Sequence, residues 1–237
     1  MTKTDAVFAF SRAFAEATKR GAGYDEALGC ALKAEYSSRE PVVLRDNLLA
    51  GRPGSASLVL LDHGGLYTTE LPESLVGTEH EAEVRAALAE WQSRSTGAAF
   101  ANAIEASFTV EEKATLQEPS LGWGGGWGGH AILNFEYVLN HGIVGLTDYV
   151  QRHLAMAEET GAAEAKLGWY RGLLCVCAGI RAFILNHSTK ASQLATEATE
   201  EADRIHFQGI AEICEHLTTG PARDLREAVQ LLWFIHV

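Results

Sequence analysis

The stretch TTGPARDLREAVQLLWFIHV, residues 218–237, opens on a helix break and closes on an apolar run. Gly220 and Pro221 interrupt a preceding helix, and Asp224 with Glu227 suits the start of a new one. If this apolar end stayed exposed to water, the fold would lose several kcal/mol of hydrophobic stabilisation, at about 25 cal/mol per Å² of apolar surface. The sequence therefore predicts a final helix whose apolar tip is covered by further polypeptide or by a partner subunit.

Helical periodicity dominates the rest of the chain. The helices that it predicts span residues 5–20, 24–36, 79–92, a segment starting at Thr109, 131–140, a segment capped by Thr147 and closed by Gly161, 162–187, and 189–217. Residues 40–77 contain three prolines and the run SLVLL at 57–61, so we expect an irregular segment with one or two short strands. The predicted fold class is mainly α.

The charge pattern argues against nucleic acid and membrane partners. The chain of 237 residues carries a net charge of -12 with only 19 Lys and Arg residues, none of them clustered. Polyanions and anionic lipid surfaces would therefore repel it. The start of the chain lacks the apolar core of a signal peptide, and the longest apolar run, 173–185, is short of the roughly 20 residues of a membrane span. These features favour a cytoplasmic protein.

The four cysteines are predicted to be reduced and mostly buried, as is usual for a cytosolic chain. They are Cys30, Cys175, Cys177 and Cys214. Cys175 and Cys177 lie two residues apart in a helical pattern and so point about 200° apart. That geometry makes them a poor disulfide pair and a poor pair of metal ligands.

The most unusual stretch is GWGGGWGGH, residues 122–130. It does not fit a phosphate-binding loop, because no buried strand precedes it and no Lys-Ser/Thr pair follows it. Two interpretations stay open. In the first, glycine lets the backbone approach a small-molecule substrate, Trp123 and Trp127 wall the pocket, and His130 donates a hydrogen bond to a hydroxyl or carboxylate. In the second, the stretch is a turn whose tryptophans pack in the core.

The remaining chemistry-bearing residues do not form a convincing site. The chain lacks an HExxH motif and a G-x-S-x-G elbow. Glu212 and His216 share a helix face, but no third ligand is evident, so no metal site is predicted. The acidic residues between 197 and 203 are interpreted as a solvated helix face.

The second half of the chain resembles the glycyl radical enzymes, the pyruvate formate-lyase-like lyases and dehydratases. The matching elements are GGH at 128–130, YVLNHGIVGL at 137–146, KLGWYRGLLCVCAGIRAF at 166–183 and, most closely, GIAEICEHLTTGPARDLREAVQLLWFIHV at 209–237. Trp91 matches an upstream tryptophan of the family. The resemblance is good over 79–237 and weak over 1–78, so residues 1–237 are interpreted as one incomplete domain of this type.

The resemblance implies a fold, a cofactor and partners. Members are much longer and form a ten-stranded α/β barrel wrapped in helices, of which this chain resembles the N-terminal, mainly helical part. In the family a glycine near the C-terminus stores a radical, an S-adenosylmethionine iron–sulfur activase installs it, and a cysteine on a barrel loop passes it to the substrate. Neither the cysteine loop nor the glycine loop is recognisable here, so no catalytic residue is assigned. In some members a histidine in a comparable position contacts a substrate hydroxyl. The resemblance therefore implies the same role for His130.

The leading hypothesis is therefore the N-terminal segment or subunit of a glycyl radical lyase or dehydratase, inactive alone. Its expected partners are the remainder of the enzyme or a complementary subunit, the activase, a small-molecule substrate and further copies in a homo-oligomer. One alternative is a non-catalytic helical binding or scaffold module derived from the family. Another is an unrelated helical interaction protein.

Overall fold

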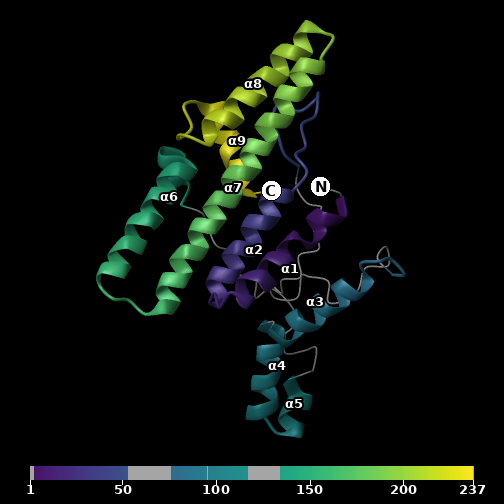
Figure 1. The fold of residues 1–237 in the computed structure, drawn as a ribbon, viewed down its shortest axis with the longest axis vertical. Helices are drawn as coiled ribbons and strands as arrows, with labels where there is room; N and C mark the ends of the chain where they lie inside the picture. Colours follow the sequence, from purple (N-terminus) through teal and green to yellow (C-terminus); the bar gives the residue numbers. More distant parts are fainter. Residues whose placement is uncertain (1–2, 53–75, 95, 117–133, 237) are drawn as a thin grey trace. The chain divides into compact units, whose positions relative to one another are not determined.

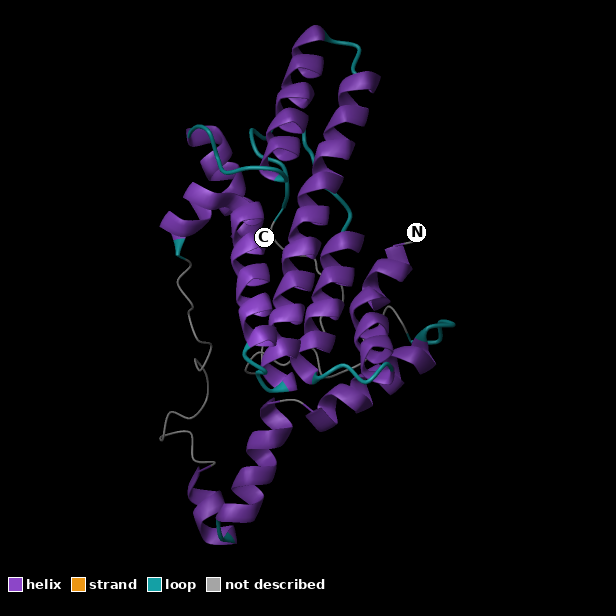
Figure 2. Ribbon diagram, turned by 60° about the vertical axis from the view of Figure 1, so that its left-hand side comes forward, coloured by secondary structure: helices purple, strands orange, loops and turns teal. Residues whose placement is uncertain are grey.

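A computed structural model describes residues 3–52, 76–94, 96–116 and 134–236. The chain divides into two compact units, one formed by residues 1–57 and 133–237 and the other by 58–132. The first unit contains α1 (Lys3–Lys19), α2 (Tyr24–Ser38), α6 (Phe135–Glu159), α7 (Glu164–Glu197), α8 (Glu201–Leu217) and α9 (Leu225–His236). The second contains α3 (Glu81–Arg94), α4 (Thr96–Ser107) and α5 (Val110–Leu116). Every regular element in the described ranges is a helix, as Figure 2 shows, and the mainly α prediction is confirmed.

The long helix α7 is the central element of the first unit, with α2, α6 and α8 packed along it (Figure 1). The sequence predicted a break at residue 188, and this is wrong. His187 Nδ1 lies 2.8 Å from the Phe183 carbonyl oxygen, and Ser188 Oγ donates to the Ala211 carbonyl oxygen at 2.9 Å. Because these side chains find partners within the helix and on α8, they do not compete with the helical backbone. The helix continues to Glu197.

Helix α6 contains a kink at Gly142, where the backbone has φ 65° and ψ −172°. The predicted stop at this glycine is confirmed, because only glycine adopts this conformation cheaply. A Cβ there would also lie 2.6 Å from the Gly220 carbonyl oxygen, so the 218–221 turn contacts the kink directly. The predicted N-cap at Thr147 is wrong: its hydroxyl donates to the Ile143 carbonyl at 2.7 Å from inside the helix.

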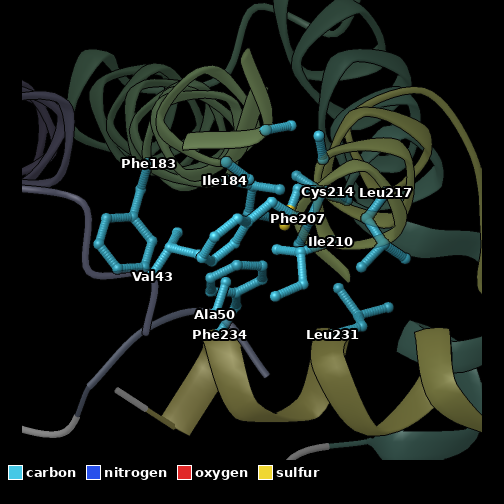
Figure 3. Close-up of a cluster of buried hydrophobic side chains, with 14 of the residues drawn as sticks. Val43, Ala50, Phe183, Ile184, Phe207, Ile210, Cys214, Leu217, Leu231 and Phe234 are labelled. Atoms are coloured by element: carbon cyan, nitrogen blue, oxygen red, sulfur yellow. The ribbon is translucent and has the colours of Figure 1, made fainter. Parts of the chain in front are cut away.

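The apolar C-terminal run packs in part against its own chain, whereas the sequence predicted that further polypeptide or a partner subunit would cover it. Leu231 and Phe234 are 0% and 3% exposed. Figure 3 shows them facing Val43, Ala50 and side chains of α7 and α8. The physical reason is that α9 is amphipathic, so a run that reads as continuous in the sequence divides between two helix faces. Leu225 and Val229 stay exposed, at 79% and 43%.

The irregular segment predicted at 40–77 is described only in part. Residues 41–52 form no helix or strand, as expected, whereas the predicted strand at 57–61 lies outside the described residues. In the second unit Val84 of α3 is fully buried. The predicted helix start at Thr109 is confirmed by a capping box before α5, in which the Thr109 N–H donates to Glu112 at 2.8 Å and the Glu112 N–H donates to the Thr109 hydroxyl at 3.3 Å. Helix α4 had not been predicted.

Among the described residues, α7 alone is long and apolar enough to cross a membrane, with a mean hydropathy of 1.3 over an 18-residue window. Its packing indicates a different role. The helix packs against α2, α6 and α8 and buries Cys177, Phe183 and Ile184 there, whereas Trp169 and Leu185 stay exposed.

Candidate functional site

The predicted pocket residues Trp123, Trp127 and His130 lie outside the described residues, so their role stays a prediction. The described chain resumes at Asn134, which caps α6 by accepting a hydrogen bond from the Tyr137 N–H at 3.0 Å. The described residues that follow the glycine-rich stretch therefore begin with a capped helix start.

A row of rings follows this helix start along α6 and reaches α7. We call Tyr137, His141, Tyr149, His153 and Tyr170 the aromatic row. The centroid of the Tyr137 ring lies 4.3 Å from that of His141 and 5.8 Å from that of Tyr149. The His153 centroid lies 4.3 Å from that of Tyr149 and 6.2 Å from that of Tyr170. The Tyr137 hydroxyl donates to the Gly145 carbonyl at 3.3 Å, across the kink at Gly142. These contacts hold the two halves of α6 together, which is a structural role.

A second group of polar side chains fixes the corner between α8 and α9. The Glu227 side chain is 2% exposed and accepts from the Arg223 N–H at 2.7 Å and from Arg223 Nη2 at 2.5 Å. The hydrogen bonds from Arg223 hold the pKa of Glu227 below its usual value despite its burial. Asp224 caps the helix by accepting from the Glu227 N–H at 2.9 Å, which confirms the predicted start of α9.

His216 contacts the same corner. Its Nε2 lies 2.8 Å from the Pro221 carbonyl oxygen, which can only accept, so Nε2 carries the proton. The same nitrogen is 3.8 Å from Glu227, whereas Glu212, its predicted companion, is exposed. Within the described ranges, no group of three or more His, Cys, Asp or Glu side chains could hold a metal ion.

The charge state of Glu227 predicts how stability depends on pH. A folded pKa below the unfolded value of 4.5 contributes stability that is present above pH 4.5 and lost as the pH falls further. We expect Glu227→Gln to lower the free energy of unfolding at pH 7, because glutamine cannot make the charge-assisted hydrogen bonds with Arg223. The loss should be only about 1–2 kcal/mol, because water screens the largely exposed Arg223. The difference from wild type should shrink between about pH 5 and 3 in urea titrations.

The control for this experiment is Glu215→Gln, the same substitution at an exposed position of α8. It should change the urea midpoint little at any pH. A gap between wild type and Glu227→Gln that stays constant down to pH 3 would show that the carboxylate charge contributes nothing.

A third group fastens the irregular segment 41–52 to the helices. The Gln230 side chain accepts from the Ala50 N–H at 2.8 Å and donates to the Ala50 carbonyl at 2.9 Å, with both residues buried. Trp233 Nε1 donates to the Gly51 carbonyl at 3.3 Å. His187 Nε2 accepts from the Val42 N–H at 3.2 Å, and burial lowers the pKa of this imidazole, which stays neutral. This group was not predicted, because its members lie far apart in the chain.

The cysteines divide into two buried thiols and one close pair. Burial raises the pKa of Cys177 and raises that of Cys214 to about 12, so neither is an activated nucleophile. Both agree with the predicted buried thiols. Cys30 of α2 and Cys175 of α7 are half-buried, and their sulfur atoms lie 3.7 Å apart. This pair was not predicted, because 145 positions separate the two residues.

Comparisons with known proteins extend these observations. The family model described as pyruvate formate lyase-like matches residues 60–237. The 4-hydroxyphenylacetate decarboxylase glycyl radical subunit of Clostridioides difficile strain 630 is 25% identical over 114 residues, which is 46% of this chain and 13% of that protein.

Two solved structures share the fold over nearly the whole chain. The hydroxyproline dehydratase of Clostridioides difficile matches with a TM-score of 0.74 and 17% identity, covering 98% of this chain and 31% of that one. The glycerol dehydratase of Clostridium butyricum matches with a TM-score of 0.70 and 18% identity, again covering 98% and 31%. This chain thus spans less than a third of the length of either enzyme.

The helical arrangement around α7 is therefore one found within glycyl radical enzymes. With a family model matched over three quarters of its length, the chain belongs to the pyruvate formate lyase-like family.

Proposed function

We propose that this chain is the N-terminal, mainly helical part of the α/β barrel of a glycyl radical lyase or dehydratase. The observation that carries the proposal is the structural match, which covers nearly all of this chain and about a third of two dehydratases. The same match supports the view that residues 1–237 form one incomplete domain. It also supports a requirement for a remainder, either a longer gene product or a complementary subunit.

In this proposal the chain supplies binding surface and support, and it is inactive alone. The glycyl radical would supply hydrogen-atom abstraction, and it would be stored on a glycine outside this sequence. The iron–sulfur cluster would belong to the activase. The described residues do not fit such a cluster, because they bring no group of three cysteines together. The complete enzyme would work in the cytoplasm, as a homo-oligomer, on a small-molecule substrate.

The test is reconstitution under anaerobic conditions. The chain would be incubated with an activase and S-adenosylmethionine, alone and together with the polypeptide encoded downstream. We expect an organic radical signal in electron paramagnetic resonance from the mixture and none from the chain alone. If the downstream polypeptide contains no cysteine and glycine loops, and the mixture gives no radical, the helical scaffold module derived from the family becomes the better explanation.

His130 is the proposed substrate contact within this function, between the tryptophans Trp123 and Trp127 and α6. Loss of its hydrogen bond to a substrate hydroxyl should lower kcat/KM of the completed enzyme about 10- to 100-fold in His130→Ala. His153→Ala, a substitution in the aromatic row, is the control and should retain most of the activity. An unchanged kcat/KM in His130→Ala would remove this residue from the site.

A further inference from the structure

Cys30 and Cys175 are the two cysteines that the fold brings together. Their sulfur atoms are 3.7 Å apart, and both side chains are half-buried, so a small reagent can reach them. Cys177 and Cys214 are buried, at 4% and 0% exposure. One pair of thiols in this chain is therefore both close and accessible.

The backbone holds the two thiols at this separation. Gly29 precedes Cys30 on α2, and Gly172 lies one turn before Cys175 on α7. A Cβ atom at residue 29 would overlap the backbone of Gly172, so the two helices cross in direct backbone contact. A disulfide needs a sulfur–sulfur distance of about 2.05 Å. Closing the remaining gap of about 1.7 Å is within the range of side-chain rotation.

We propose that Cys30 and Cys175 form a reversible disulfide that links α2 to α7 when the chain meets a low-molecular-weight disulfide such as oxidised glutathione. One protein thiolate attacks a sulfur of the reagent, which releases one reduced glutathione and leaves a mixed disulfide. The second protein thiolate attacks the protein sulfur of that mixed disulfide and releases a second reduced glutathione. The two protein protons end on the released thiols, and the two protein electrons reduce the reagent.

The environment of Cys175 sets how this reaction depends on pH. Burial raises the pKa of Cys175 to about 11, with smaller contributions from Cys30 and Glu26, while Lys33 acts in the opposite direction. Each cysteine must attack once in either order of steps, so Cys175 must be a thiolate at one of them. The rate of closure should therefore rise about tenfold for each pH unit between pH 7 and 9.

Mass spectrometry of the whole chain tests the proposal independently of the proposed function. The folded chain would be incubated with oxidised glutathione, its free thiols alkylated, and its peptides mapped. We expect a Cys30–Cys175 peptide pair at least tenfold more abundant than any other cysteine pair, and its loss with dithiothreitol. The same oxidation in 6 M guanidinium, where the chain is unfolded, should give a mixture of different cysteine pairs. The disulfide should also raise the midpoint of thermal unfolding of the unit by about 5–10 °C.

Variants separate the proposed pair from general thiol reactivity. Cys30→Ser and Cys175→Ser should each abolish the linked peptide and the rise in midpoint, whereas Cys177→Ser should retain both. Mixed disulfides with glutathione at both positions, without the protein disulfide, would overturn the proposal. So would equal yields of several pairs in the folded wild-type chain, a result that does not depend on whether the serine variants fold.

Discussion

Replacing Gln230 by alanine should lower the free energy of unfolding by about 2–4 kcal/mol. The Gln230 side chain satisfies both the N–H and the carbonyl of Ala50, and Ala50 is fully buried. Alanine leaves both backbone groups without partners, at a cost of about 1–3 kcal/mol for each unsatisfied group, and water that enters the small cavity recovers part of this. Chemical denaturation of the wild-type chain and the variant measures the difference.

Gln208→Ala is the matched control, because Gln208 is exposed on α8. It should change stability by less than about 0.5 kcal/mol. Hydrogen exchange gives a second measurement, since protection of the Ala50 amide should fall in Gln230→Ala while the centre of α7 keeps its protection. Equal stability of the Gln230 and Gln208 variants would show that the two backbone bonds contribute nothing.

Local sequence signals predicted most of the helices because each helix carries its own periodicity and end signals. The N-cap of α9 at Asp224 and the capping box at Thr109 lie within one turn of the residues they bond. The predicted break in α7 failed for the opposite reason. Ser188 bonds to a carbonyl 23 residues away on α8, a contact that no local pattern encodes.

The features that join distant parts of the chain could not be predicted in this way. The bond between Gln230 and Ala50 spans 180 positions, and the pair of Cys30 and Cys175 spans 145. A glutamine inside an apolar helix face was the one available signal, since a buried amide needs partners. Its partner, Ala50, could not be identified from any local pattern. The burial of Leu231 and Phe234 illustrates the same limit. The segment around Val43 and Ala50 that packs against them was predicted to be irregular, and this prediction gave no contact with α9.

Gly172→Ala should lower the free energy of unfolding by about 2–3 kcal/mol. An added Cβ at residue 172 would overlap the carbonyl group of Asp25 and lie 3.4 Å from the Cα atom of Glu26. Backbone atoms cannot rotate away, so α2 and α7 must separate. The packing energy lost in this way should exceed the stability that alanine gains over glycine from its higher helix propensity.

Gly168→Ala provides the control on the same helix, one turn earlier. A Cβ there would meet the Glu26 side chain at 3.7 Å, an ordinary contact, so alanine should be neutral or stabilise by up to about 1 kcal/mol. Opposite signs for Gly172→Ala and Gly168→Ala would show that backbone contact, and not helix propensity, sets the crossing of α2 and α7. The wider crossing in Gly172→Ala should also slow formation of the Cys30–Cys175 disulfide at least tenfold. An unchanged closure rate in a folded Gly172→Ala chain would mean that this crossing does not fix the distance between the two sulfur atoms.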